Sequence, residues 1–243
     1  MKQTLFITGT DTGVGKTVLT ALLTRFLRER GVNAAAFKPI CSGGRDDARA
    51  LHAAMDRALT LDEINPWHFH AAIAPSLAAR LERKSVTLAE VVAHGRALQR
   101  QFDVLLAEGA GGLLSPLGIY SGGLRPSPAS ALTERRYKET FDSRDLMVAL
   151  RAIPIIVAQN KLGAVNHILL TLEALPKNLL AKARVVLMSP PKPDAATKTN
   201  AKLLADYFDT GRIVTLPWFG PRFSLPKALK IPGIQARLRT LTR

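Results

Sequence analysis

The chain has 243 residues, 47% of them hydrophobic and 22% charged, which excludes a wholly disordered polypeptide and allows one large domain or two small ones. Its net charge of +15 suggests an anionic partner, but residues 1–121 carry 14 basic and 11 acidic side chains, whereas residues 122–243 carry 20 and 8. The only cysteine, Cys41, excludes an intramolecular disulfide and a multi-cysteine metal site.

Short apolar segments alternate along the chain with segments of helical periodicity. The predicted strands are 5–8, 34–37, 104–107, 153–158, 185–188 and 213–216. The predicted helices are 17–30, 48–59, 87–101, 165–175 and 196–208. The segment 60–76, with Pro66 and Pro75, is expected to be irregular.

This alternation predicts an α/β fold with three layers, in which helices cover both faces of a mostly parallel sheet. We expect one domain over residues 1–243, with a basic loop insertion at about 118–140 that is rich in Gly, Ser, Pro and Arg. No segment approaches the ~20 apolar residues of a membrane span, and the apolar run before Gly9 is too short for a signal peptide. We therefore expect a cytoplasmic protein without a membrane partner.

Residues 9–17, Gly-Thr-Asp-Thr-Gly-Val-Gly-Lys-Thr, lie between a predicted strand and a predicted helix and resemble a phosphate-binding P-loop. Backbone N–H groups of such a loop bind phosphate oxygens, Lys16 can reach the β- and γ-phosphates, and Thr17 can ligate Mg²⁺. The spacing differs from the strict pattern, because Thr10 stands at the first glycine position and Gly9 comes one residue early. Asp11 stands where chromosome-partitioning ATPases carry a second lysine, which argues against that class.

Other candidate residues follow the predicted strands, at the edge of the sheet where parallel α/β folds bind ligands. Lys38 can place an ammonium beside the phosphates, and Glu108 stands at the expected end of its strand before a glycine-rich turn. Either Asp46 or Asp47 could be a magnesium ligand, while the other caps a helix. Cys41 is expected to be a small buried residue and His167 a structural helix residue.

The motifs together resemble the dethiobiotin synthetase family over roughly residues 3–175. The matching segments are 9–17, Lys-Pro-x-x-Ser-Gly at 38–43, Asp47-Ala48, Glu-Gly-Ala-Gly-Gly with Pro-Leu at 108–117, and Lys-Leu-Gly-x-x-Asn-His at 161–167. The resemblance implies a P-loop NTPase fold and a C–N ligase that uses ATP and Mg²⁺. Such an enzyme carboxylates 7,8-diaminopelargonic acid with CO₂ and closes the ring of dethiobiotin, a step of biotin synthesis.

The resemblance also implies roles for individual residues. Those for catalysis are Lys38, Lys16 and Thr12. Those for nucleotide binding are Gly13, Val14, Gly15, Lys16, Thr17, Asp47 and Glu108, of which Thr17, Asp47 and Glu108 would hold the metal. Those for the diamine are Ser42, Gly111, Gly112, Leu113, Gly163, Ala164 and Asn166. Members of the family are homodimers in which the substrate carboxylate meets the 163–166 turn of the partner subunit.

This chain departs from the family pattern near the base of the nucleotide. The family often has an asparagine after its fifth strand to recognise adenine, whereas this chain has Met188 and no asparagine in the segment 186–190. Base selectivity is therefore open. A member of the same fold that amidates a cobalamin precursor is one alternative, although such enzymes need a glutaminase domain. The other alternative is a nucleotide-switched ATPase that binds nucleic acid through its basic half; we expect no nucleic-acid partner.

Overall fold

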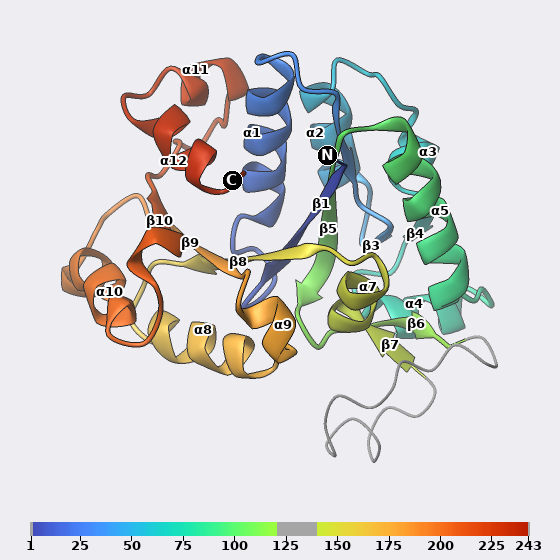
Figure 1. Cartoon of the computed structure of the whole chain (residues 1–243). Helices are drawn as coiled ribbons and strands as arrows, with labels where there is room; N and C mark the ends of the chain where they lie inside the picture. The colour runs from blue at the N-terminus through green and yellow to red at the C-terminus, as the bar shows by residue number, and fades with distance from the viewer. Residues whose placement is uncertain (1, 121–139, 243) are drawn as a thin grey trace.

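The computed structural model describes residues 2–120 and 140–242 (Figure 1). Six parallel strands form the main sheet in the order β10-β9-β8-β1-β5-β2. The strands are β1 (Gln3–Gly9), β2 (Ala34–Phe37), β5 (Val104–Gly112), β8 (Ile153–Gln159), β9 (Arg184–Met188) and β10 (Ile213–Leu216). All six strands expected from the sequence are confirmed. The inner strands are apolar segments largely buried on both faces of the sheet, whereas the edge strand β10 buries Val214 and Leu216 and leaves Ile213 and Thr215 partly buried.

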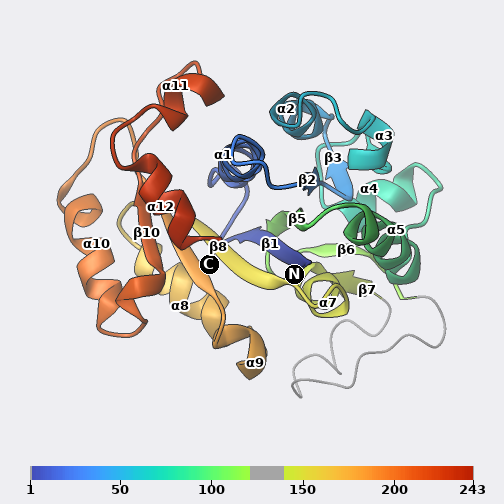
Figure 2. The ribbon, with the colours of Figure 1, turned by 45° about the horizontal axis from the view of Figure 1, so that its top comes forward.

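Helices cover both faces of the sheet, as Figure 2 shows for α1 and α11 on one side and α8 and α9 on the other. Leu5 and Ile7 of β1 pack in the core beneath the first group of helices, and Phe6 packs in the opposite core. The first group is α1 (Lys16–Arg28), α11 (Leu225–Leu229) and α12 (Ile234–Thr240). The second is α5 (Leu88–Gln101), α7 (Ser143–Ala149), α8 (Ala164–Glu173), α9 (Lys177–Leu180) and α10 (Ala195–Ala205). The predicted three-layer α/β fold is confirmed.

The prediction that 60–76 is irregular is wrong. This segment contains α3 (Leu61–Ile64) and β4 (Trp67–Phe69), and α4 (Pro75–Leu81) begins within it. Strand β4 pairs in parallel with β3 (Ile40–Ser42), which was not among the predicted strands. These elements are too short to show periodicity, and α3 is stabilised by a capping box between Thr60 and Glu63.

Further differences concern boundaries and short elements. Helix α2 (Asp46–Ala54) begins two residues before the predicted 48–59 and ends five residues sooner. The predicted insertion at about 118–140 lies mostly outside the described residues. Its two described ends belong to a small antiparallel pair, β6 (Pro116–Ile119) and β7 (Thr140–Asp142), rather than to loop. A short 3₁₀ helix (Thr210–Arg212) precedes β10.

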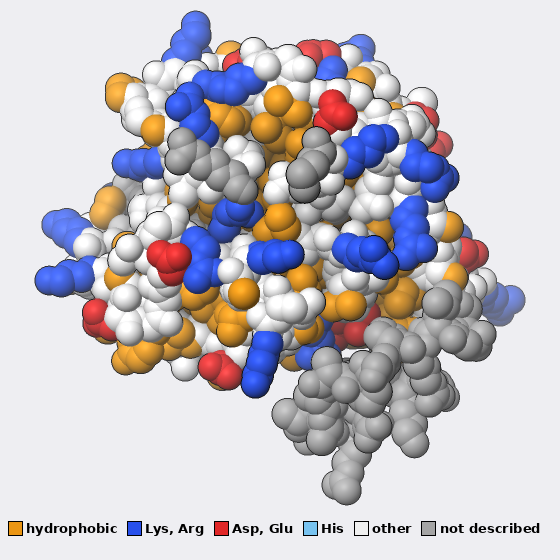
Figure 3. All heavy atoms as spheres, viewed as in Figure 1, with side chains coloured by type: hydrophobic (Ala, Val, Ile, Leu, Met, Phe, Trp, Pro, Cys, Tyr) orange, Lys and Arg blue, Asp and Glu red, His pale blue; other side chains and the backbone are white. Residues whose placement is uncertain are grey.

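Part of the excess positive charge has a structural use. Arg144 donates from Nη1 to the carbonyl of Ala174 at the end of α8, at 3.3 Å, and Arg212 donates to the carbonyl of Ala181 after α9, at 2.8 Å. Cations are favourable at helix C-termini because carbonyl groups there carry partial negative charge. Figure 3 shows Lys and Arg side chains spread over the face in view, with Asp and Glu among them, rather than gathered in one patch. Within residues 2–120 and 140–242, no helix combines the length and the apolarity that crossing a membrane requires.

Candidate active site

The loop between β1 and α1 has the backbone of a phosphate cradle. Gly13 and Gly15 have φ of 73° and 99°, in the left-handed region that glycine adopts without strain. A Cβ at Gly9 would lie 2.7 Å from Cγ2 of Val14 and 2.8 Å from the Asp11 carbonyl oxygen. The glycine that stands one residue early is therefore required for the loop to close. Lys16 Nζ donates to the Asp11 carbonyl at 2.8 Å and so extends over the loop.

A cluster of charged side chains lies next to this loop. Lys38 Nζ is 2.7 Å from Glu108 Oε1 and 2.9 Å from Asp47 Oδ2. The Lys38 side chain is 4% exposed and that of Glu108 is fully buried. Thr17 Oγ1 donates to Glu108 Oε1 at 2.8 Å. The structure thus brings together four residues that the sequence placed in four separate segments.

The ionisation of this cluster follows from burial and from its charges. Burial alone would lower the pKa of Lys38, but the Glu108 and Asp47 carboxylates raise it above its ordinary value. Burial and the Lys38 ammonium lower the pKa of Lys16 to about 8. Burial opposes ionisation of Asp47 as well, yet the Lys38 ammonium holds the pKa of Asp47 below its ordinary value. The charged form of Lys16 is therefore less stabilised than that of Lys38 when no anion is bound beside it.

The carboxylates of the cluster fit a divalent cation. Glu108 Oε2 is buried and has no hydrogen-bond partner. The two neighbouring aspartates differ in their surroundings, since the Asp46 side chain is 95% exposed and pairs with Arg49, whereas Asp47 faces Lys38. No group of three or more His, Cys, Asp or Glu residues in the described ranges is placed to hold a metal. Two carboxylates and the Thr17 hydroxyl leave coordination positions for phosphate oxygens and water, the usual environment of Mg²⁺ at a nucleotide.

A pocket of about 770 Å³ opens beside the P-loop and the charged cluster. Thr12, Ser42 and Gly111 line it, as the resemblance implied. Its far wall is the 72–75 segment, which the sequence did not suggest. Ser42 Oγ donates to the Ile73 carbonyl at 2.6 Å, and this contact joins the end of β3 to that wall.

Gly112 and Leu113, which were expected to line the diamine pocket, do not line this pocket. Gly112 pairs with Gly9 in the sheet, and the Leu113 side chain is buried in the core. Gly163, Ala164 and Asn166 form the start of α8 and do not line the 770 Å³ pocket. Val14 is buried in the core beneath the P-loop, where its backbone remains part of the loop.

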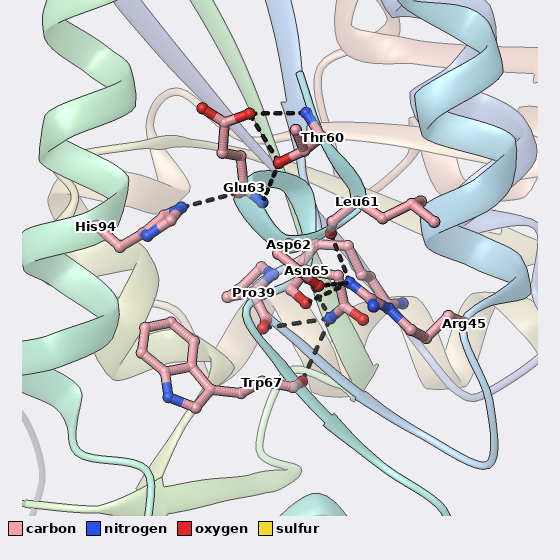
Figure 4. A network of polar contacts seen from close by, with 10 residues as sticks. Pro39, Arg45, Thr60, Leu61, Asp62, Glu63, Asn65, Trp67 and His94 are labelled. Carbon is pink, nitrogen blue, oxygen red and sulfur yellow. Dashed lines mark hydrogen bonds and ion pairs between the residues drawn. The ribbon is translucent and has the colours of Figure 1, made fainter. Parts of the chain in front are cut away.

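Residues that position Lys38 were not found from the sequence. Asn65 is fully buried, and its Nδ2 donates to the carbonyls of Lys38 at 2.8 Å and Pro39 at 3.3 Å. Arg45 Nη2 donates to the carbonyl of Asn65 and to Asp62 Oδ1, as Figure 4 shows. A buried asparagine in a polar segment carries no periodic signal. The only hint is its place directly before Pro66.

Cys41 is confirmed as a small buried residue. Its side chain is buried at the edge of the pocket, and burial raises the pKa of the thiol to about 11. A thiol in this state is a poor nucleophile at neutral pH. His167 is confirmed as a residue of α8, on the exposed surface of that helix.

Comparison with known proteins identifies the family. The chain is 40% identical over 219 residues to an ATP-dependent dethiobiotin synthetase of Anaeromyxobacter dehalogenans, an alignment that spans 88% of this chain and 89% of the relative. The chain belongs to the dethiobiotin synthetase family. Another synthetase, from Akkermansia muciniphila, is 35% identical, with 85% of this chain and 88% of the relative aligned. A third, from Thermodesulfovibrio yellowstonii, is 33% identical, with 90% of each chain aligned.

The family profile and the solved structures agree with this assignment at the level of the fold. The profile of an AAA domain matches residues 3–121, the part that contains the P-loop, Lys38 and Glu108. A ParA bound to nonspecific DNA superposes with a TM-score of 0.54 at 12% identity, over 100% of this chain and 98% of the other. A MinC:MinD complex of Aquifex aeolicus gives 0.53 at 14% identity, over 99% and 94%. At such low identity these two likenesses show the P-loop fold alone.

Proposed function

We propose that this member of the dethiobiotin synthetase family converts 7,8-diaminopelargonic acid, CO₂ and ATP to dethiobiotin, ADP and phosphate. The observation that carries the proposal is the buried contact of Lys38 with Glu108 and Asp47 beside a P-loop, at the mouth of a pocket large enough for a second substrate. An ATPase that only hydrolyses its nucleotide needs no such pocket next to the γ-phosphate. The reaction itself requires mostly positioning and charge stabilisation.

The residues fit each bond-making step. One substrate amine adds to CO₂ and loses a proton, which gives a carbamate. A carbamate oxygen then attacks the γ-phosphorus and ADP leaves. The second amine attacks the carbamoyl carbon, the C–O bond to phosphate breaks, and the proton lost by the amine leaves with the phosphate as the ring closes. Lys16 and Lys38 would neutralise charge on the phosphate and the carbamate, Thr12 and Ser42 would contact the reacting groups, and the backbone at Gly111 would border the diamine.

The proposal includes Mg²⁺ held by Thr17, Asp47 and Glu108. The unpartnered Glu108 Oε2 supports it, because a buried polar atom without a partner is costly and a metal ion would supply that partner. Bound there, Mg²⁺ would supply charge neutralisation on the β- and γ-phosphates. As ligands of the ion, the Thr17 hydroxyl and the Asp47 carboxylate would help to position the phosphates over Gly13 and Gly15.

The proposal also includes a homodimer in which the 163–166 turn contacts the substrate of the partner subunit. Because Gly163, Ala164 and Asn166 lie outside this chain's own pocket, they could meet a diamine only across an interface. Apolar side chains are exposed beside this turn: Leu162, just before α8, is 84% exposed, and Leu170 of α8 is 63% exposed. Sedimentation analysis would test the dimer, and Leu170→Glu is expected to shift it toward monomer.

The function is tested by product formation. Purified protein with diamine, bicarbonate, ATP and Mg²⁺ is expected to give dethiobiotin by mass spectrometry, and folded protein that gives none would contradict the proposal. A nucleic-acid-binding ATPase would instead bind DNA at physiological salt with a steep salt dependence in a filter assay. We expect no such binding. The cytoplasmic location expected from the sequence is tested by cell fractionation.

A further inference from the structure

A second pocket, of about 450 Å³, lies on the other side of the P-loop from the charged cluster. It shares Gly13, Gly15 and Val18 with the 770 Å³ pocket, so a molecule bound through phosphates at the loop can extend into it. Its walls come from the loops after β8, β9 and β10, at the carboxyl edge of the sheet. This is where the base and sugar of a nucleotide would lie if its phosphates occupy the loop.

The walls of this pocket are mainly apolar. Met188 packs against the P-loop, because a Cβ added at Gly15 would lie 3.1 Å from Met188 Cγ and Cε. Trp218 lies in the lining and is 46% exposed. Phe219 and Phe223 also line the pocket and contact each other edge to face, with ring centroids 5.8 Å apart. Aromatic and thioether surfaces stack on any planar base, since every base has a π-face.

The backbone of the same pocket offers few donors to the edge of a base. Pro190, Pro191 and Pro217 have no N–H. The N–H of Ser189 donates to the Leu216 carbonyl at 2.9 Å, and the Met188 carbonyl accepts from Asn160 N–H at 2.8 Å. At these positions the groups that could contact the edge of a base are therefore missing or already used within the fold.

The amide groups of two polar side chains in the lining are also engaged within the fold. Asn160 is fully buried, and its amide bonds to the Thr197 carbonyl at 3.0 Å and to Asn200 at 2.9 Å. Gln159 Nε2 donates to the Gly13 carbonyl at 3.3 Å. The Ser189 hydroxyl can rotate to donate or to accept, and the exposed Lys161 ammonium contributes charge that uncharged bases do not distinguish.

We propose that this pocket holds the nucleotide base by stacking between Met188 and Trp218 without recognising its edge, so that the protein binds ATP, GTP, CTP and UTP with similar affinity. The inference rests on the proposed function only in taking the P-loop as the triphosphate site. Trp218 would raise the affinity for any nucleotide above that for a polyphosphate without a base. It would not favour one base over another.

The experiment uses binding rather than turnover. The chain has two tryptophans, Trp67 and Trp218, so a Trp67→Phe variant makes Trp218 the sole indole reporter. This variant is titrated with ATP, GTP, CTP, UTP and inorganic tripolyphosphate in Mg²⁺, by fluorescence and calorimetry. We expect dissociation constants within tenfold for the four nucleotides and at least tenfold weaker binding of tripolyphosphate. A spread above tenfold among the nucleotides, or tripolyphosphate that binds as well as they do, would overturn the inference.

Two further variants make the test specific. Trp218→Ala is expected to weaken all four nucleotides by a similar factor of about 5–30, in line with the loss of one stacking contact, and to leave tripolyphosphate unchanged. Tyr207→Ala, an exposed aromatic outside the pocket, is the matched control and should change none of them. The binding titrations contain no diamine, so they are independent of the test for product. A protein that makes dethiobiotin but binds only ATP would overturn the inference about the base and leave the proposed function intact. Equal nucleotide binding without product would sink only the proposed function.

Discussion

Lys38 and Glu108 form a buried ion pair, with 2.7 Å between Nζ and Oε1, although 70 residues separate them in the chain. They meet because β2 and β5 are neighbours in the sheet, with Phe37 paired to Ala107 directly before them. Asp47, at 46% side-chain exposure, joins the pair from α2. Lys38 is therefore held by two carboxylates of unequal burial. Because of this difference, substitutions of Lys38 and of Glu108 should change the stability of the protein by different amounts.

Lys38→Met should destabilise the protein more than Glu108→Gln. The first change leaves the fully buried Glu108 carboxylate without its cation, which costs about 3–5 kcal/mol in buried pairs. The second leaves Lys38 paired with Asp47, so we expect a cost of about 1–3 kcal/mol. Urea denaturation of both variants without ligands measures the difference. A Glu108→Gln variant that is the less stable of the two would contradict this view of the pair.

Lys38→Ala is expected to lower kcat by about 10²–10³ while it changes the affinity for ATP by less than threefold. The physical reason is that Lys38 would stabilise charge that develops during phosphoryl transfer, whereas Lys16 and the loop backbone bind the ground-state nucleotide. Steady-state turnover and calorimetric ATP binding give the two quantities. The control is Lys16→Ala, which should weaken both; an equal loss of turnover and affinity in Lys38→Ala would make Lys38 a nucleotide ligand only.

The Cys41 thiol should be nearly inert in the folded protein. Its pKa of about 11, raised by burial, leaves on the order of a hundredfold less thiolate at pH 8 than an ordinary cysteine has. Because the chain has one cysteine, a dithiobisnitrobenzoate assay reports this residue alone. We expect reaction to be at least a hundredfold slower in buffer than in 6 M guanidinium (about the concentration that unfolds most small domains). Comparable rates in the two solutions would mean that the site is open to solvent.

The two aspartates that cap α7 should make stability depend on pH. Asp142 Oδ1 accepts from the N–H of Asp145 at 3.0 Å, and Asp145 Oδ2 accepts from the N–H of Asp142 at 2.9 Å. Burial and the Asp145 carboxylate raise the pKa of Asp142 to about 7. Since this exceeds the unfolded value of roughly 3.9, the contribution is complete below about pH 4 and is lost as pH rises through 7.

Asp142→Asn tests this linkage, because asparagine keeps the capping acceptor and removes the charge. Measured by urea denaturation, the variant should gain about 1–2 kcal/mol relative to wild type between pH 5 and pH 8. Asp206→Asn, at an exposed aspartate, is the control and should gain nothing. If the two variants follow the same pH profile, the Asp142 carboxyl does not titrate in this range.

The sequence by itself determined the six strands and the chemistry of their loops. Apolar segments such as 34–37 and 104–107 are buried on both faces of a parallel sheet, so they can be recognised without knowledge of their neighbours, and the P-loop is a local motif. The tertiary structure decided what depends on contacts between distant segments. It placed Asp47 rather than Asp46 at Lys38, brought Asn65 to the Lys38 carbonyl, and formed the 72–75 wall of the pocket. It also left the 163–166 turn outside that pocket and gathered Met188 and Trp218 beside the P-loop. The physical reason is that burial and periodicity are properties of a segment, whereas a site is the place where the ends of several strands meet.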